Sequence, residues 1–225
     1  MIRDAVVMAA GIGSRLRPVT GRFAKPVLPI DGTPVIVSLL RELATVELER
    51  IAIVTGHLGS QIERLLDGYP LELRFATQPE PLGSADAVRR AEPQAPALVA
   101  AADTLFTRGD IGRFAAGAAG AAGAIAVRST PPQPGQTRIR VEGDRVIRLA
   151  DRDSQVTGAP LWFLGEQLVR ELGALPGPPF ELAAAFQRAV DDGEEIRAVQ
   201  IGKTRDLTDP LDLVEENFPY LRGLE

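Results

Sequence analysis

Two glycines and two basic residues near the start of the chain form a pattern suited to binding phosphate groups. The loop reads Ala9-Ala10-Gly11-Ile12-Gly13-Ser14-Arg15-Leu16-Arg17-Pro18-Val19-Thr20, and Lys25-Pro26-Val27-Leu28-Pro29-Ile30 follows it closely. Glycines let the backbone turn tightly and present its N–H groups to an anion, while Arg15 and Lys25 add fixed positive charge. The combination indicates a nucleoside triphosphate that undergoes chemistry.

Two common phosphate-binding loops do not fit these letters. A Walker loop needs Lys-Ser or Lys-Thr directly after its last glycine, whereas Gly13 is followed by Ser14 and Arg15. A dinucleotide fingerprint needs a third glycine at position 16, which is Leu16. For the Gly-x-Gly alone, an ordinary turn between a strand and a helix stands as an equal alternative.

The complete string is far more specific, and it resembles the nucleotide-sugar pyrophosphorylases, the sugar-1-phosphate nucleotidyltransferase family. Their signature is Gly-x-Gly-x-Arg-Leu-x-Pro-x-Thr, followed by Lys-Pro and a second pair of proline and a hydrophobic residue. The resemblance implies a Rossmann-like, three-layer α/β nucleotide-diphospho-sugar transferase fold. Its central sheet would be mostly parallel and would carry a small β-hairpin acceptor lobe. The implied reaction transfers a nucleoside monophosphate from a nucleoside triphosphate to a sugar 1-phosphate and releases pyrophosphate.

The same resemblance implies roles for individual residues of the nucleotide-binding half. Arg15 would neutralise the departing pyrophosphate, and Lys25 would stabilise charge on the α-phosphoryl group. The residues expected to bind the nucleotide are Ala10, Gly11, Gly13, Ser14, Gln78, Gly83 and Ser84. Gln78 suits contact with a base because its amide can donate to one atom and accept from another. Taken by itself, Gln78 also fits a surface residue before a turn.

Two aspartates are the metal ligands that the resemblance implies, with Mg²⁺ or Mn²⁺ as the cofactor. Asp103 ends an apolar strand, and Asp206 precedes the last helix; Asp209 and Asp212 are expected to be turn and helix-cap acids. The chain has no cysteine and a single histidine, His57, which leaves carboxylates and phosphate oxygens as ligands for a hard ion. For His57 we favour a structural or substrate-edge role over catalysis.

The acceptor half matches the family less closely. Asp151 and Arg152 stand where the family has a Glu-Lys pair, and Gly158 follows Thr157 as in the family's Thr-Gly before the next strand. Arg binds phosphate through a planar guanidinium group, whereas Lys offers a point charge. The Asp-Arg pair therefore keeps one acid and one base, but the distance that each side chain spans is different. A solvated charged turn is the alternative interpretation of the pair. Two other functions stay open: cytidylyl or other nucleotidyl transfer to a phosphorylated alcohol such as phosphocholine or inositol phosphate, and a non-catalytic nucleotide-sugar-binding subunit.

Alternating strands and helices are expected to position these residues. Expected strands cover 5–8, 50–55, 71–76, 97–102, 124–128, 137–141, 145–149, 159–164 and 196–201. Expected helices cover 34–43, 59–66, 84–91, a segment from about 111 that leads to the strand 124–128, 166–172, 180–191 and a closing segment from 210. Ser84 is expected to cap its helix, and Trp162 to be a core aromatic residue. The Pro-rich loop 131–134 is expected to be mobile. We expect a single domain over 1–225, with a nucleotide-binding half (1–110), an acceptor-binding half (111–205) and a closing segment (206–225).

The net charge and the lengths of the apolar runs limit the kinds of partner that the chain can have. Its 225 residues carry a formal net charge of −5, which argues against a nucleic-acid-binding surface. No apolar run approaches the roughly 20 residues that a membrane-spanning helix needs. Met1 leads directly into the first expected strand, so a cytoplasmic location is expected. The expected partners are the nucleoside triphosphate and the sugar 1-phosphate, and the oligomeric state, the nucleobase and the acceptor stay open.

Overall fold

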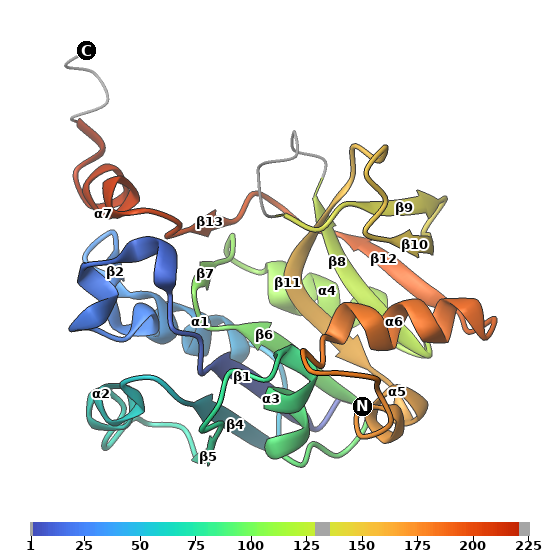
Figure 1. Ribbon diagram of the computed structural model, residues 1–225, viewed down its shortest axis with the longest axis horizontal. Coiled ribbons are helices and arrows are strands. Elements are labelled where there is room, and N and C mark those ends of the chain that lie inside the picture. The colour runs from blue at the N-terminus through green and yellow to red at the C-terminus, as the bar shows by residue number, and fades with distance from the viewer. Residues whose placement is uncertain (1, 129–135, 221–225) are drawn as a thin grey trace.

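A nine-stranded sheet forms the centre of the protein in this computed structural model, which describes residues 2–128 and 136–220 (Figure 1). The strand order across the sheet is β5-β4-β1-β6-β11-β8-β12-β10-β9. These strands are β1 (Asp4–Ala9), β4 (Arg50–Thr55), β5 (Leu73–Thr77), β6 (Ala97–Ala101), β8 (Gly123–Arg128), β9 (Ile139–Glu142), β10 (Arg145–Leu149), β11 (Thr157–Leu164) and β12 (Ile196–Gln200). Strands β5, β4, β1 and β6 are mutually parallel, β8 and β12 are parallel, and β11 and β10 run against their neighbours. The predicted mostly parallel α/β sheet is confirmed.

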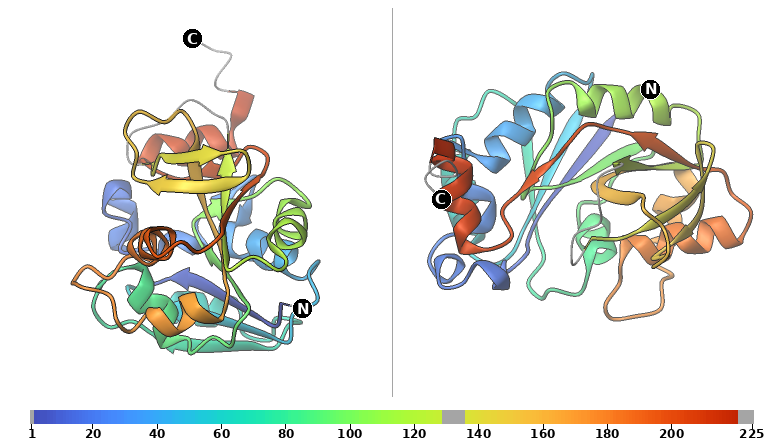
Figure 2. Two further views of the ribbon diagram at one scale, coloured as in Figure 1. Left: turned by 90° about the vertical axis from the view of Figure 1, so that its right-hand side faces the viewer. Right: turned by 90° about the horizontal axis from the view of Figure 1, so that it is seen from above.

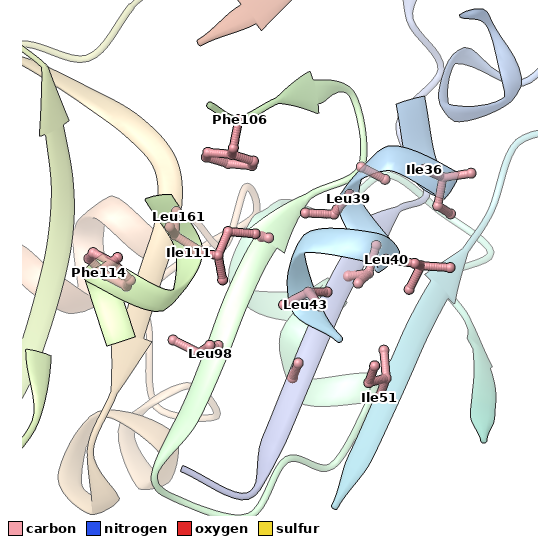
Figure 3. Packing of buried hydrophobic residues seen from close by; sticks show 14 of the residues in the cluster. Ile36, Leu39, Leu40, Leu43, Ile51, Leu98, Phe106, Ile111, Phe114 and Leu161 are labelled. Atoms are coloured by element: carbon pink, nitrogen blue, oxygen red, sulfur yellow. The ribbon is translucent and has the colours of Figure 1, made fainter. Parts of the chain in front are cut away.

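Helices cover both faces of the sheet, because its central strands are apolar on both sides. One face carries α1 (Val35–Leu43), α2 (Gly59–Leu65) and α4 (Asp110–Ala118), and the other carries α3 (Ser84–Arg90), α5 (Glu166–Glu171) and α6 (Leu182–Asp191) (Figure 2). On the first face, Leu40 and Leu43 of α1 and Phe114 of α4 belong to the buried cluster that also contains the sheet residue Leu98 (Figure 3). Within the described ranges, no helix has the length and apolar character needed to cross a bilayer.

Short elements connect the sheet to the region of the glycine loop. They are the 3₁₀ turns Ser14–Leu16, Val19–Gly21 and Lys25–Val27, the strands β2 (Pro29–Ile30), β3 (Thr33–Pro34), β7 (Thr104–Leu105) and β13 (Arg205–Asp206), and the helix α7 (Pro210–Asn217). Leu16, Ile30 and Leu207 form part of a small buried cluster separate from the two main ones. This cluster anchors the glycine loop and the segment after Asp206 to each other.

The expected hairpin is present, and it extends the sheet. Gly143, with φ of 62°, and Asp144 form the turn between Glu142 and Arg145, which pair directly. Strand β10 then joins β12 through Arg145 and Arg197, so the hairpin forms the sheet's edge. The loop 131–134 lies outside the described residues.

Two further expectations concern single residues. Trp162 is half-buried and packs against the core of the second face, as expected for a core aromatic. The prediction that Ser84 caps α3 is wrong, because Gly83 is the N-cap and Ser84 is the first helical residue. The Ser84 hydroxyl instead donates to Glu181 at 2.5 Å and accepts from the Leu182 backbone at 2.8 Å. It therefore joins the start of α3 to the start of α6.

Gly83 is the position where we expect a single methyl group to disturb the fold. Its φ is 110°, and a Cβ would lie 2.3 Å from the Phe180 carbonyl oxygen. We expect Gly83→Ala to lower the free energy of unfolding by about 2 to 4 kcal/mol, from backbone strain and steric overlap together. Gly68→Ala is the matched control, since Gly68 has φ of 70° but nothing within 4 Å of its would-be Cβ. It should lose only about 1 kcal/mol in urea unfolding, and equal losses would contradict the packing argument.

Candidate active site

A cleft of about 450 Å³ opens beside the glycine loop, where β1 and β6 end. Ligands of open α/β sheets bind at the carboxyl ends of parallel strands, so this is the expected position. The predicted residues that line it are Ala10, Gly11, Gly13, Ser14, Arg15, Lys25, Gln78, Gly83, Ser84 and Asp103. Segments from three separate parts of the nucleotide-binding half therefore converge on one cavity.

The glycine loop is held in its turn by the residues that follow it. Gly13 has φ of 66°, and its carbonyl oxygen accepts from the Thr20 hydroxyl at 2.8 Å and from the Leu16 backbone at 2.9 Å. A Cβ on Gly13 would lie 3.0 Å from the Thr20 methyl group and 3.3 Å from the Lys25 Cβ. Gly13 thus allows the loop to pack closely against Thr20 and Lys25.

His57 supports this loop from behind. Its Nε2 lies 2.9 Å from the Thr20 carbonyl oxygen, and it does not appear among the residues that line the cleft. This contact is a structural one, and the preference for a structural or substrate-edge role of His57 over catalysis stays a prediction.

Lys25 forms the closest charged contact of the cleft. Its Nζ donates to Asp103 Oδ2 at 2.5 Å, and the Lys25 side chain is only 13% exposed. Arg15 also lines the cleft and is exposed to solvent. One basic group is therefore held against the carboxylate that was predicted to bind a metal, while the other is free to meet a ligand.

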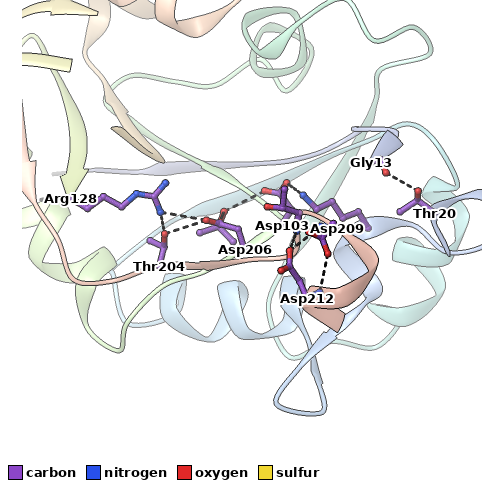
Figure 4. Close-up of polar contacts among 11 residues, drawn as sticks. Gly13, Thr20, Asp103, Arg128, Thr204, Asp206, Asp209 and Asp212 are labelled. Atoms are coloured by element: carbon purple, nitrogen blue, oxygen red, sulfur yellow. Dashed lines mark hydrogen bonds and ion pairs between the residues drawn. The ribbon is translucent and has the colours of Figure 1, made fainter. Parts of the chain in front are cut away.

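Asp206 reaches Asp103 through a short strand pair. Residue Asp206 of β13 pairs with Thr104 of β7, the residue directly after Asp103. The Thr104 hydroxyl donates to Asp206 Oδ1 at 2.5 Å and lies 3.4 Å from Asp103 Oδ1, so one hydroxyl is close to both carboxylates. Figure 4 shows Asp103 and Asp206 on the same side of the fold, with Arg128 and Thr204 beyond Asp206. Two aspartates that are far apart in the chain thus come together.

The closing segment holds Asp206 in place. Arg205 pairs with Asp31 of the β2–β3 turn at 2.5 Å and with Glu216 of α7. The Arg205 hydrogen bond is the main cause that lowers the pKa of Asp31. Asp209 and Asp212 form a capping box at the start of α7, which confirms the role predicted for them. These contacts tie α7 to the glycine-loop region and keep β13 beside β7.

Asp206 has an environment in which its negative charge is costly. Burial raises its pKa and the charge of Asp103 adds to that effect, whereas the Thr104 hydrogen bond and the charges of Arg128 and Lys25 lower it. Arg128 is buried, and its Nη1 lies 3.4 Å from Asp206 Oδ2 and also bonds Thr204. The pKa of Asp206 remains above its ordinary value after these effects are combined. A further cation would therefore favour the state in which both Asp103 and Asp206 are ionised.

The donor set fits a hard divalent ion. Mg²⁺ in phosphate-handling sites is usually bound by one or two carboxylates together with substrate oxygens. Asp103 and Asp206 offer such a pair next to the cleft, and a metal bound there would relieve the cost of placing two carboxylates together. No group of three or more acidic, histidine or cysteine ligands occurs within residues 2–128 and 136–220, so the fit is to a two-carboxylate site.

The predicted acceptor residues lie apart from the cleft lining: Asp151 and Arg152 are on the link between β10 and β11, and Gly158 is the second residue of β11. The Asp151 backbone donates to the Arg138 carbonyl at 3.1 Å, and the Arg152 carbonyl accepts from Arg138 Nη1 at 2.5 Å. The Gly158 backbone donates to the Thr137 carbonyl at 2.8 Å. These contacts shape the loop around Arg138, and the binding roles of Asp151, Arg152 and Gly158 stay predictions.

Three residues near the site were missed from the sequence. Glu181 lines the cleft, but it comes from the start of α6 and no local pattern marks it. Thr208 lines the cleft from the closing segment. Arg128 was detectable in principle, because it is a charged residue that ends the apolar run Ala124–Val127.

The mostly parallel sheet and the glycine loop at the end of β1, with the Lys25–Asp103 pair in the same cleft, are typical of an α/β protein that binds a nucleotide. The chain belongs to the MobA-like NTP transferase domain family, whose model matches residues 5–191.

Curated relatives share parts of this chain. CMP-5′-(3-aminopropyl)phosphonate synthase of Streptomyces rubellomurinus is 30% identical over 209 residues, which cover 84% of this chain and 33% of that protein. The 2-aminoethylphosphonate cytidylyltransferase of Lancefieldella rimae is 40% identical over 67 residues, which cover 30% of this chain and 27% of that protein. The chain therefore spans a third or less of the length of these two relatives.

Solved structures share the fold over nearly the whole chain. The inositol-1-phosphate CTP transferase from T. maritima superposes with a TM-score of 0.82 at 19% identity, over 94% of this chain and 91% of that chain. A UDP-glucose pyrophosphorylase complexed with UDP-glucose superposes with a TM-score of 0.84 at 19% identity, over 99% and 100% of the two chains. At this identity, the likeness establishes the fold.

Proposed function

We propose that this chain transfers a nucleoside monophosphate from a nucleoside triphosphate to a small acceptor that carries a phosphate or phosphonate group, with a sugar 1-phosphate as the first candidate. The observation that carries the proposal is the Lys25–Asp103 pair, at 2.5 Å, in the same cleft as the glycine loop. A cleft that only held a nucleotide would not need a buried lysine against a carboxylate next to a second carboxylate.

In the proposed reaction, an oxygen of the acceptor's phosphate or phosphonate group attacks the α-phosphorus of the triphosphate. The bond from the α-phosphorus to the bridging oxygen breaks, and pyrophosphate leaves with the electron pair. The main difficulty is electrostatic, because one polyanion approaches another. Lys25 would stabilise charge on the α-phosphoryl group, and Arg15 would neutralise the departing pyrophosphate. No general base is required, because the attacking group is already ionised near neutral pH.

Asp103 and Asp206 would hold the divalent cation of the site, Mg²⁺ or Mn²⁺. When bound, this cation supplies positive charge to the phosphate oxygens. The role of the chain is to keep the two carboxylates together, which it achieves through Thr104 and the β7–β13 pair.

A second candidate is cytidylyl transfer to a phosphonate or a phosphorylated alcohol. The two curated relatives described above are named for cytidylyl transfer to, or CMP attachment on, aminoalkylphosphonates. The departure of Asp151-Arg152 from the Glu-Lys pair also favours an acceptor other than a common sugar phosphate. The residues of the nucleotide-binding half fit both candidates equally, so the acceptor distinguishes the two candidates.

Pyrophosphate release tests the proposal directly. The purified chain with Mg²⁺ should release pyrophosphate from one of CTP, UTP, dTTP, GTP or ATP only when an acceptor is present. Glucose 1-phosphate as the best acceptor would support the first candidate, and 2-aminoethylphosphonate or phosphocholine would support the second. Nucleotide binding without release for every combination would contradict an enzymatic function and favour a binding subunit.

A further inference from the structure

Gln78 reaches the cleft with only part of its amide available. It follows β5, lines the cleft and is 6% exposed. Its Nε2 donates to the Gly83 carbonyl oxygen at 3.0 Å and to Asp86 Oδ2 at 2.9 Å. A carbonyl and an ionised carboxylate only accept hydrogen bonds, so both amide hydrogens are used within the protein. The oxygen Oε1 is the polar atom that Gln78 can offer to a ligand.

Asp86 is itself held from the other side. It lies on α3 and is 3% exposed, with Arg90 Nε donating to Oδ2 at 2.7 Å and Arg89 Nη2 donating to Oδ1 at 3.0 Å. Burial raises the pKa of Asp86, but hydrogen bonds from Arg90, Gln78 and Arg89 outweigh it and place the pKa below its ordinary value. Asp86 is therefore ionised at neutral pH and remains an acceptor.

The orientation of the Gln78 amide follows from this arrangement. If the amide turned over, its oxygen would face the Gly83 carbonyl and the Asp86 carboxylate. Three hydrogen-bond acceptors would then lie together in a buried place without a donor between them, which is unfavourable. Gly83 cannot withdraw, because its backbone is packed against the Phe180 backbone, which donates to the Leu82 carbonyl at 2.7 Å. The amide is thus locked.

We propose that Asp86 is a positioning residue that locks the Gln78 amide, so that the base subsite offers a hydrogen-bond acceptor and selects a nucleobase edge that carries an N–H group. This inference rests on the proposed function, because it assumes that a nucleotide base lies against Gln78. The selected chemistry is a ring N–H, as in uracil, thymine or guanine, or an exocyclic amine, as in cytosine, adenine or guanine. A base edge with only a hydrogen-bond acceptor at this point would leave both that acceptor and Gln78 Oε1 without a donor.

Asp86→Asn tests the lock, because an asparagine can present an amine to Gln78 in place of the carboxylate oxygen and so removes one of the two acceptors that oppose the turned-over amide. Asp110→Asn is the matched control: Asp110 is also a buried acid on a helix, paired with Arg113 at 2.6 Å, and it lies on α4 away from Gln78. Calorimetry would measure the binding of CTP, UTP, GTP and ATP, and of inorganic triphosphate as a probe of the phosphate end alone.

We expect the affinity ratio between the best and the worst nucleotide to fall about tenfold in Asp86→Asn and to stay unchanged in Asp110→Asn. Triphosphate binding should be the same in both variants and the wild type. An unchanged ratio in Asp86→Asn, or an equal loss of triphosphate binding, would overturn the positioning role. Wild-type protein that binds none of the four nucleotides would overturn the proposed function and this inference with it.

A measurement on the wild-type protein keeps the inference testable if Asp86→Asn does not fold. In ¹⁵N-labelled protein, both Gln78 side-chain amide protons should be protected from exchange with water, and they should remain so when the preferred nucleotide saturates the cleft. Rapid exchange of either proton in the free protein, or re-orientation of the amide toward the base on binding, would contradict the lock.

Discussion

Asp103→Asn should reduce the turnover of pyrophosphate release by about 10³-fold, because it removes one of the two charges that would hold the divalent cation. Asparagine has nearly the same shape, and the Asp103 side chain is 37% exposed, so the fold has little reason to change. We expect the free energy of unfolding to stay within about 1 kcal/mol of the wild-type value. Steady-state rates at saturating nucleotide and acceptor, with urea unfolding in parallel, give both quantities.

The matched control for this change is Asp209→Asn. Asp209 is an exposed N-cap residue of α7, and asparagine is as good an N-cap as aspartate, so neither stability nor turnover should change appreciably. Turnover of Asp103→Asn near the wild-type level in excess Mg²⁺ would remove Asp103 from the proposed metal site. A large loss of stability would instead assign it a structural role.

Lys25→Met should lower turnover by about 10² to 10³-fold, since it removes the charge that would stabilise the α-phosphoryl group and keeps most of the side-chain stem. The stem is largely buried, and methionine can fill the same space, so the expected effect on folding is small. The effect should appear in kcat more than in the binding of the free nucleotide, because the charge matters most as pyrophosphate departs. Single-turnover rates separate this chemical step from binding.

Lys203→Met provides the control for Lys25→Met, because Lys25 and Lys203 are the only lysines in the sequence and Lys203 is exposed. It should leave turnover unchanged. Lys25→Arg should recover part of the lost rate by restoring the charge, although its planar fork does not match the contact with Asp103. A kcat for Lys25→Met within a few-fold of the wild type would show that the Lys25–Asp103 pair is a structural contact.

Most of the fold could be predicted from local patterns. Each signal lies within a few neighbouring residues: the apolar run of β1, the amphipathic spacing of α1 and the Gly143-Asp144 turn. These elements begin and end within two residues of the expected positions. The cap of α3 was placed wrongly because serine before a helix is a strong local signal. The contacts that decided it come from Glu181 and Leu182, on a helix much later in the chain.

Phosphate binding at the glycine loop is predicted from the sequence, since Gly13, Arg15 and Lys25 lie close together along the chain and their chemistry follows from their types. The contact of Lys25 with Asp103 follows from the tertiary structure alone. The same is true of Asp206, which is separated from Thr104 by 102 positions and accepts a hydrogen bond from the Thr104 hydroxyl beside Asp103. The tertiary structure also decided that Gln78 offers an oxygen, because Asp86 and Gly83 take both amide hydrogens. The physical reason is that periodicity and turn chemistry act over a few residues, whereas the meeting of side chains across the fold depends on the order of strands and the packing of the closing segment.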